Sequence, residues 1–556
     1  MAEQEIQNKP PAKYKRILKW IGVGCLALIL IAAVYFRAPW KVIALLLIFL
    51  SACTVLPKPA RKWFLAGIGL VVLGLIIWVF LPEDNEGWRP YTFDDEFATL
   101  EAKYAVPDEQ NAATIYNELL NKYDQQSPDP NLMVDDFYYT SMYEHWNSDD
   151  HPEIAQWLTK QQETIATLLQ ASELEKCRFT IWSDPVSLQD STRILAAMRE
   201  WVNLLILSGN NDLGEGRLFA GLRKYIAASH MGTQLRQQPA LIDKLVAISF
   251  EGTAARQLRI FVVDGDATEE YLRTIEEVLG ANKYDWTSDM MSVLEHEKLY
   301  AKNEWCTAYE IDTKGRIRLS RDPAAQQRAL RDKQLESWDL PKDARDALKF
   351  RFWQRKLMKA NTIVSWFYMP SNPERVAGAV DMGFEKLYAL AQPSFEWSRK
   401  PGELSIRSRF SIPVRLSYLV WFKKWYATKF VKGISRWDYY KFHELYQRRV
   451  TDKRGTQLVI GLQRYKNRNG NWPETLEDIR SLAPADVFVD PSNGGSFVYK
   501  LRQDTFILYS RGINNIDETG QRWSDDDGSG PDDWLIWPSE RRLHEMNEEH
   551  AQEPPT

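Results

Sequence analysis

Cysteine and histidine are scarce in this chain, which has four of the first and seven of the second among 556 residues. So few cysteines exclude a disulfide framework, and we expect Cys25 and Cys53 to be small packing residues in apolar segments. Cys177 and Cys306 could pair in an oxidising compartment, and the sequence leaves this open. The net charge of −5 gives no electrostatic basis for nucleic-acid binding.

Sequence signatures of common catalytic sites are also missing. The chain contains no HExxH, Walker A, GxSxG, CxxC or Rossmann glycine pattern. Glu295-His296-Glu297 is the densest group of acids around a histidine, but neighbouring residues of a helix point apart, so we interpret it as part of a helix surface. No catalytic residue can be named, and no small-molecule ligand is indicated.

Three apolar runs near the N-terminus predict membrane-spanning helices. They cover Ile17–Phe36, Val42–Leu56 and Phe64–Leu81, and a helix needs roughly 20 apolar residues to cross a bilayer. The second run has only 15 residues, so whether it spans fully stays open. Because the runs contain no acidic residue or histidine, we interpret residues 17–82 as an anchor and not as a transport pathway.

Basic residues next to these runs predict the orientation of the anchor. Lys13, Lys15 and Arg16 precede the first run, and Lys58, Arg61 and Lys62 lie between the second and third. Since lysine and arginine are enriched on the cytoplasmic side, residues 1–16 are expected in the cytoplasm and residues 83–556 outside it. We therefore predict an integral protein of the bacterial inner membrane.

The middle of the chain has the periodicity of helices. After a stalk at residues 83–94, apolar residues recur at helical spacings through residues 95–450, most clearly from Ser191 to Val263. Ser208–Asn211 reads as a turn within that block, and alternation near 305–320 predicts a small β-hairpin. Helical hairpins of similar length predict an array that offers an interaction surface.

The region from residue 451 to 537 carries a more specific pattern. Leu462-Gln463-Arg464-Tyr465-Lys466-Asn467-Arg468-Asn469-Gly470-Asn471-Trp472-Pro473 is followed by Asp490-Pro491, Tyr499 and Phe506-Ile507-Leu508-Tyr509-Ser510. This order resembles the globular domain of the major pseudopilins of bacterial type II secretion. The whole chain also looks like a group of bacterial membrane-anchored envelope proteins with such a tail. The resemblance implies an α+β module, and residues 538–556 are expected to be a disordered tail.

The resemblance also implies a calcium site in the loop after the predicted hairpin. The candidate ligands are Asp517, Asp525, Asp527, Asp532 and Asp533. Ca²⁺ takes six to eight oxygen ligands, so a glycine-containing loop dense in carboxylates suits it chemically. The loop lacks the spacing of an EF-hand, and a solvated acidic loop remains the alternative.

These observations predict a mainly α fold with three N-terminal transmembrane helices, a helical-hairpin ectodomain and a small α+β pseudopilin-like C-terminal module. The expected function is a membrane-anchored extracytoplasmic interaction or scaffold protein of the bacterial envelope, with a protein partner and possible structural calcium. The alternative is an extracytoplasmic hydrolase that acts on glycans or envelope polymers through paired carboxylates.

Overall fold

The computed structural model describes residues 87–122, 141–180, 187–265, 267–306, 309–320, 372–385, 387–393, 424–502, 505–521, 531–539 and 542–543, together with a few isolated positions. The chain divides into two compact units. The first unit comprises Met1–Phe93, Tyr300–Lys386 and Ile406–Ile434, and the second comprises Asp94–Leu299, Leu387–Ser405 and Ser435–Thr556.

The first unit contains a three-stranded antiparallel sheet in the order β1-β2-β3. Its strands are β1 (Trp88–Pro90), β2 (Tyr309–Asp312) and β3 (Ile317–Leu319). The hairpin of β2 and β3 is the one predicted near 305–320. Its turn is held by Asp312, whose Oδ1 accepts hydrogen bonds from the backbone N–H groups of Lys314 and Arg316, and Gly315 supplies the positive φ of 77°. Helix α18 (Pro373–Phe384) also belongs to this unit.

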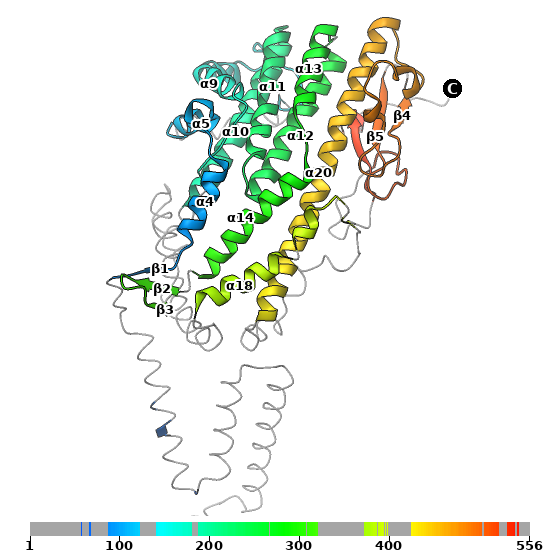
Figure 1. Ribbon diagram of the computed structural model, residues 1–556. Helices are drawn as coiled ribbons and strands as arrows, with labels where there is room; N and C mark the ends of the chain where they lie inside the picture. Colours follow the sequence, from blue (N-terminus) through cyan, green and yellow to red (C-terminus); the bar gives the residue numbers. More distant parts are fainter. Residues whose placement is uncertain are drawn as a thin grey trace, which may run out of the picture. The chain divides into compact units, whose positions relative to one another are not determined.

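The second unit is built mainly of helices (Figure 1). In chain order they are α4 (Asp94–Tyr104), α5 (Ala112–Leu120), α8 (Pro152–Lys160), α9 (Gln162–Ser172), α10 (Ser187–Gly214), α11 (Leu218–Arg236), α12 (Leu241–Asp264), α13 (Glu269–Ala281), most of α14 (Trp286–Cys306) and most of α20 (Lys424–Asn469). Short loops join α10, α11 and α12, which lie side by side (Figure 1). Their shared core includes Met198, Leu205, Tyr225, Met231 and Phe261.

The predicted turn at Ser208–Asn211 is wrong, because α10 continues through it to Gly214. Asn210 and Asn211 are buried, and their side-chain amides donate to the carbonyl oxygens of Ser141 and Trp146. These bonds satisfy polar groups that in a free segment would compete with the helix backbone. Tertiary packing therefore outweighs the turn preference of the sequence.

Helix α20 is shared between the helical core and a second sheet. That sheet has the order β4-β5-β6, with β4 (Val498–Leu501), β5 (Phe506–Ser510) and β6 (Trp534–Trp537) all antiparallel to their neighbours. A Cβ atom on Gly455 of α20 would lie only 2.7 Å from Ile536, so helix and strand approach closely there. On the same helix, Arg464 forms ion pairs with Glu269 and Glu276 of α13. The domain boundary predicted at residue 451 falls inside α20.

The predicted fold class is wrong in its three N-terminal transmembrane helices. Across the described residues, none of the helices is long and apolar enough to cross a membrane. Even α12, which is apolar along much of its length, carries Lys244, Glu251, Arg256 and Arg259. The predicted anchor at residues 17–82 lies outside the described residues apart from Pro57, Ala66, Gly67 and Leu70. The predicted location in the bacterial inner membrane depends on those helices and on the basic residues beside them, and it stays a prediction.

Packing of α11 against α12 gives a test of this core. A Cβ atom on Gly232 would lie 2.7 Å from Cγ of Glu251 and 3.0 Å from its backbone nitrogen, whereas one on Gly252 would meet nothing within 4 Å. Gly232→Ala should therefore lower the free energy of unfolding by about 1–3 kcal/mol. Gly252→Ala should leave it unchanged or raise it by up to about 1 kcal/mol, because alanine favours a helix. Denaturant unfolding of the full chain measures both, and equal effects would contradict this packing.

Candidate functional site

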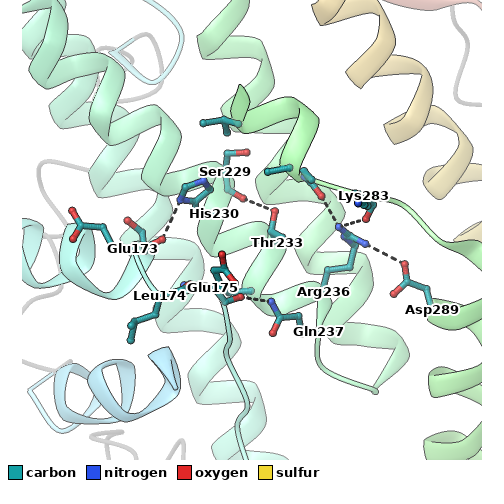
Figure 2. A pocket seen from close by; sticks show the side chains of 15 residues that line it. Glu173, Leu174, Glu175, Ser229, His230, Thr233, Arg236, Gln237, Lys283 and Asp289 are labelled. Carbon is teal, nitrogen blue, oxygen red and sulfur yellow. Dashed lines mark hydrogen bonds and ion pairs between the residues drawn. The ribbon is translucent and has the colours of Figure 1, made fainter. Parts of the chain in front are cut away.

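A cavity of about 490 Å³ opens in the second unit between the end of α9, the second half of α11, the end of α13 and the start of α14. Figure 2 shows His230, Thr233, Arg236 and Gln237 along α11, with Glu173–Glu175 on one side and Lys283 and Asp289 on the other. We call this cavity the α11 pocket. Most of the residues that line it are polar, so its chemistry depends on which of their polar groups already have partners.

His230 contributes a neutral imidazole to the α11 pocket. Its Nδ1 lies 3.0 Å from the carbonyl oxygen of Ser172, and since a carbonyl only accepts, Nδ1 must donate. Burial lowers the pKa of His230 below its ordinary value, so the ring is neutral near pH 7. Nε2 then carries the lone pair, and within the described part of the chain it accepts no hydrogen bond. The pocket thus presents a hydrogen-bond acceptor.

Glutamine side chains at the end of α11 hold one rim of the pocket in place. Gln234 Nε2 donates to the carbonyl oxygens of Ala171 and Leu174, at 2.8 and 2.6 Å. Gln237 Nε2 donates 2.7 Å to the carbonyl oxygen of Glu175, and its Oε1 accepts from the backbone of Cys177 at 3.0 Å. Because these amides bind backbone groups between Ala171 and Cys177, the segment after α9 is fixed against α11.

The buried side chain of Arg236 also lines the pocket. Its guanidinium contacts Glu251 Oε1 and Asp289 Oδ2, each at 3.2 Å, and donates 2.9 Å to the carbonyl oxygen of Lys283. Burial alone lowers the pKa of Arg236, but the carboxylates of Glu251 and Asp289 outweigh it and raise that pKa above its ordinary value. The guanidinium also lies over the ring of Tyr284, 4.4 Å from its centroid.

The ion pairs continue behind Arg236 as a network that we call the buried charge network. Lys244 Nζ lies 2.8 Å from Asp289 Oδ1, and Arg449 Nε lies 3.5 Å from Glu251 Oε2. Asp452 then contacts both Arg449 and Arg259. Four cations and three carboxylates from α11, α12, α14 and α20 thus meet inside the second unit. Glu251 is fully buried.

The α11 pocket favours binding over chemistry. Asp289 is neutralised by Arg236 and Lys244, and Glu173 at the rim pairs with Arg223 at 2.8 Å. A general acid needs a carboxyl group held protonated near neutral pH by burial or a like charge. Here each of these two carboxylates instead contacts a cation. The groups that remain for a ligand include His230 Nε2 and the exposed side chains of Glu175 and Lys283.

The structure places three of the five predicted calcium ligands near one loop. Asp517 accepts from the hydroxyl of Tyr509 at 2.6 Å, and Asp532 Oδ2 accepts from the backbone of Ile513 at 3.1 Å. Asp533 Oδ2 accepts from the backbone of Gly520 at 2.7 Å. Asp525 and Asp527 lie outside the described residues. Among the described side chains, no three acids, histidines or cysteines are grouped to hold a metal ion.

Asp533 nevertheless has the character of a cation ligand. The residue is fully buried, and its Oδ1 has no hydrogen-bond partner. Burial raises the pKa of its carboxyl group to about 6, and the neighbouring charges of Glu518 and Asp517 act in the same direction. Burial of a carboxylate oxygen without a hydrogen-bond partner lowers the stability of the fold unless the oxygen is protonated or binds a cation.

Both cysteines of the described part of the chain are free and buried. Burial raises the pKa of Cys306 to about 12 and that of Cys177 well above its ordinary value. Thiols of this kind are unreactive packing groups, because the thiolate is the reactive form. The possible pairing of Cys177 with Cys306 is therefore not formed.

The chain matches no known family model, no curated protein and no solved structure. The resemblance of residues 451–537 to the pseudopilin module thus stays a prediction. Sequence reading also missed the buried charge network, because partners such as Arg259 and Asp452 are 193 residues apart. One signal was present: α12 carries Lys244, Glu251 and Arg259 among residues that are mostly apolar.

Removal of Arg236 tests the buried charge network. Arg236→Met should lower the free energy of unfolding by about 3–5 kcal/mol, because Glu251 and Asp289 lose their shared cation. Arg223 is the matched control, since its pair with Glu173 is exposed, and Arg223→Met should cost less than about 1 kcal/mol. Denaturant unfolding of the full chain compares the two. A small effect for both variants would show that the network does not form.

Proposed function

We propose that this chain is a non-enzymatic interaction protein of the bacterial envelope, and that the α11 pocket holds a polar segment of its partner. The observation that supports this best is the arrangement of the pocket. Its walls are fixed by Gln234, Gln237 and Arg236, while His230 Nε2 and Lys283 remain for a ligand. Preorganised walls reduce the entropy lost on binding. The envelope as a location follows from the resemblance to pseudopilins.

The hydrolase alternative finds no support at the α11 pocket. It requires a desolvated carboxyl group within roughly 5–10 Å of a second one. Asp289 and Glu173 instead each contact a cation, Arg236 and Arg223. We therefore give no catalytic role to these residues.

Calcium is a second part of the proposal. A cation at Asp533 would satisfy the buried Oδ1 that no hydrogen bond reaches, and the neighbouring carboxylates of Asp517 and Glu518 would add to its attraction. Calcium suits such oxygen ligands and tolerates irregular geometry. Its role there would be to hold the loop that follows β5.

Photocrosslinking tests the binding role of the α11 pocket. With a photoreactive amino acid in place of the exposed Lys283, the full chain in bacterial cells should form a discrete adduct. The same amino acid at Phe219 is the control, since this residue is 67% exposed and lies near the opposite end of α11. His230→Phe should reduce the adduct at 283, because it keeps a ring but removes the acceptor. Equal adducts at both positions, or none at 283, would contradict the proposal.

The addition of calcium tests whether Asp533 binds this ion. Millimolar calcium should raise the Tm of the full chain, and Asp533→Asn should abolish the rise because one charged ligand is lost. The rise should also fade as the pH falls through about 6, where protons compete with the cation for Asp533. Magnesium is the ion control, since it demands stricter geometry. An undiminished calcium effect in Asp533→Asn would exclude this residue as a ligand.

A further inference from the structure

A second cavity, of about 670 Å³, lies in the same unit between α12, α20 and β6. On α12 its lining includes Ile248, Gly252, Arg256 and Arg259, which are three or four residues apart and share one face of the helix. Arg448 and Asp452 line it from α20. We call this cavity the arginine groove, and it shares no lining residue with the α11 pocket.

Arginines dominate the charged lining of the arginine groove. Five of them contribute to it: Arg256, Arg259, Arg448, Arg449 and Arg542. Among the described residues, the carboxylates of Glu144 and Asp452 also line it, and Glu444, Glu251 and Asp264 contact these arginines from outside the lining. The acids therefore offset the arginines in number, but the buried Nε of Arg256 and Nη2 of Arg449 have no hydrogen-bond partner. Such N–H groups favour a ligand that supplies acceptor oxygens, as a carboxylate does.

Carboxylates fix the orientation of most of these arginines. Glu444 contacts Arg448, Asp452 contacts Arg449 and Arg259, and both acids are almost fully buried. Asp264 holds Arg542 at 2.6 Å. A guanidinium has five N–H groups in one plane, so a carboxylate on one edge orients it without occupying all its donors. The guanidinium groups of these arginines are therefore held in place before a ligand binds.

Within the described part of the chain, Arg256 has no such carboxylate contact. Its guanidinium lies over the ring of Tyr143, 4.4 Å from the centroid, and its buried Nε has no hydrogen-bond partner. Stacking on a ring leaves the edge of the guanidinium available to an acceptor. Next to it along the same face of α12, a Cβ atom on Gly252 would meet nothing within 4 Å, so the wall is open there.

The strand β6 favours an extended ligand. It is the last strand in the order β4-β5-β6, and four consecutive residues, 534–537, line the groove. Successive side chains of a strand point to opposite faces, so four consecutive lining residues mean that the edge of the strand borders the groove. That edge is about 13 Å long at roughly 3.3 Å per residue. Extended peptides bind to sheets by pairing with such edges.

We propose that the arginine groove binds an extended acidic segment of a partner protein, which runs along β6 and places a carboxylate on Arg256. This deepens the proposed function and rests on it, because it adds a second, chemically different contact to an interaction protein. The buried N–H groups of Arg256 and Arg449 that lack an acceptor favour a carboxylate, and the strand edge favours an extended form.

Peptide binding to the full chain tests the proposal. The probe is a fluorescein-labelled peptide of alternating glutamate and valine, and its control is the same peptide with lysine for glutamate. Fluorescence anisotropy should show saturable binding of the glutamate peptide alone, weakened by salt. Gly252→Leu should reduce the affinity about tenfold by filling the groove, and Arg256→Gln should do the same by removing the cation. Gly280→Leu, on the exposed face of α13 with nothing within 4 Å, should leave it unchanged.

Several results would overturn the proposal. Equal binding of the two peptides would remove the charge argument, and unchanged affinity in Gly252→Leu would place the peptide elsewhere. Tighter binding of a single-stranded oligonucleotide would assign the arginines and tryptophans of the groove to bases and phosphates. If such results appear while the adduct at residue 283 still forms, the proposed function stands and only the groove assignment fails.

Discussion

The second unit depends on charges that are buried together. Arg236, Lys244, Arg259 and Arg449 are all withdrawn from water, and each would cost several kcal/mol without a partner. Glu251, Asp289 and Asp452 supply those partners from three different helices. Apolar contacts allow helices to slide by a residue or rotate slightly, but paired charges do not. The network therefore sets how α11, α12, α14 and α20 are aligned.

Both cavities of the proposed function take their walls from this network. Arg236 and Asp289 face the α11 pocket, while Arg259, Arg449 and Asp452 face the arginine groove. A ligand in either place meets side chains that are already held by ion pairs, so it does not have to order them. Binding to such surfaces loses little conformational entropy. The buried ion pairs of the core thus support the interaction role that we propose, because they hold the side chains that line both cavities.

The sequence allowed helices and a hairpin to be predicted, but it did not predict either cavity. Alternation around Asp312 and Gly315 predicted a hairpin that is present, because period-two patterns and turn residues act locally. The turn expected at Ser208–Asn211 was wrong because Asn210 and Asn211 found distant carbonyl partners. For the same reason the α11 pocket was missed: Ser172, His230 and Lys283 come together only through tertiary packing. Asp517, Asp532 and Asp533 were named from the resemblance to pseudopilins, and calcium binding there stays a prediction.

Helix α20 follows α12 late in the chain, yet its side chains form ion pairs with those of α12. Arg449 pairs with Glu251, and Asp452 pairs with Arg259. Arg259 and Asp452 are separated by 193 residues of sequence. At a ribosomal rate of about 5–20 residues per second, Arg259 is made roughly 10–40 seconds before its carboxylate exists. During that interval the nascent α11–α12 hairpin carries unpaired charges that resist burial. The ion pair between Arg259 and Asp452 therefore forms only after α20 has left the ribosome, well after α11 and α12.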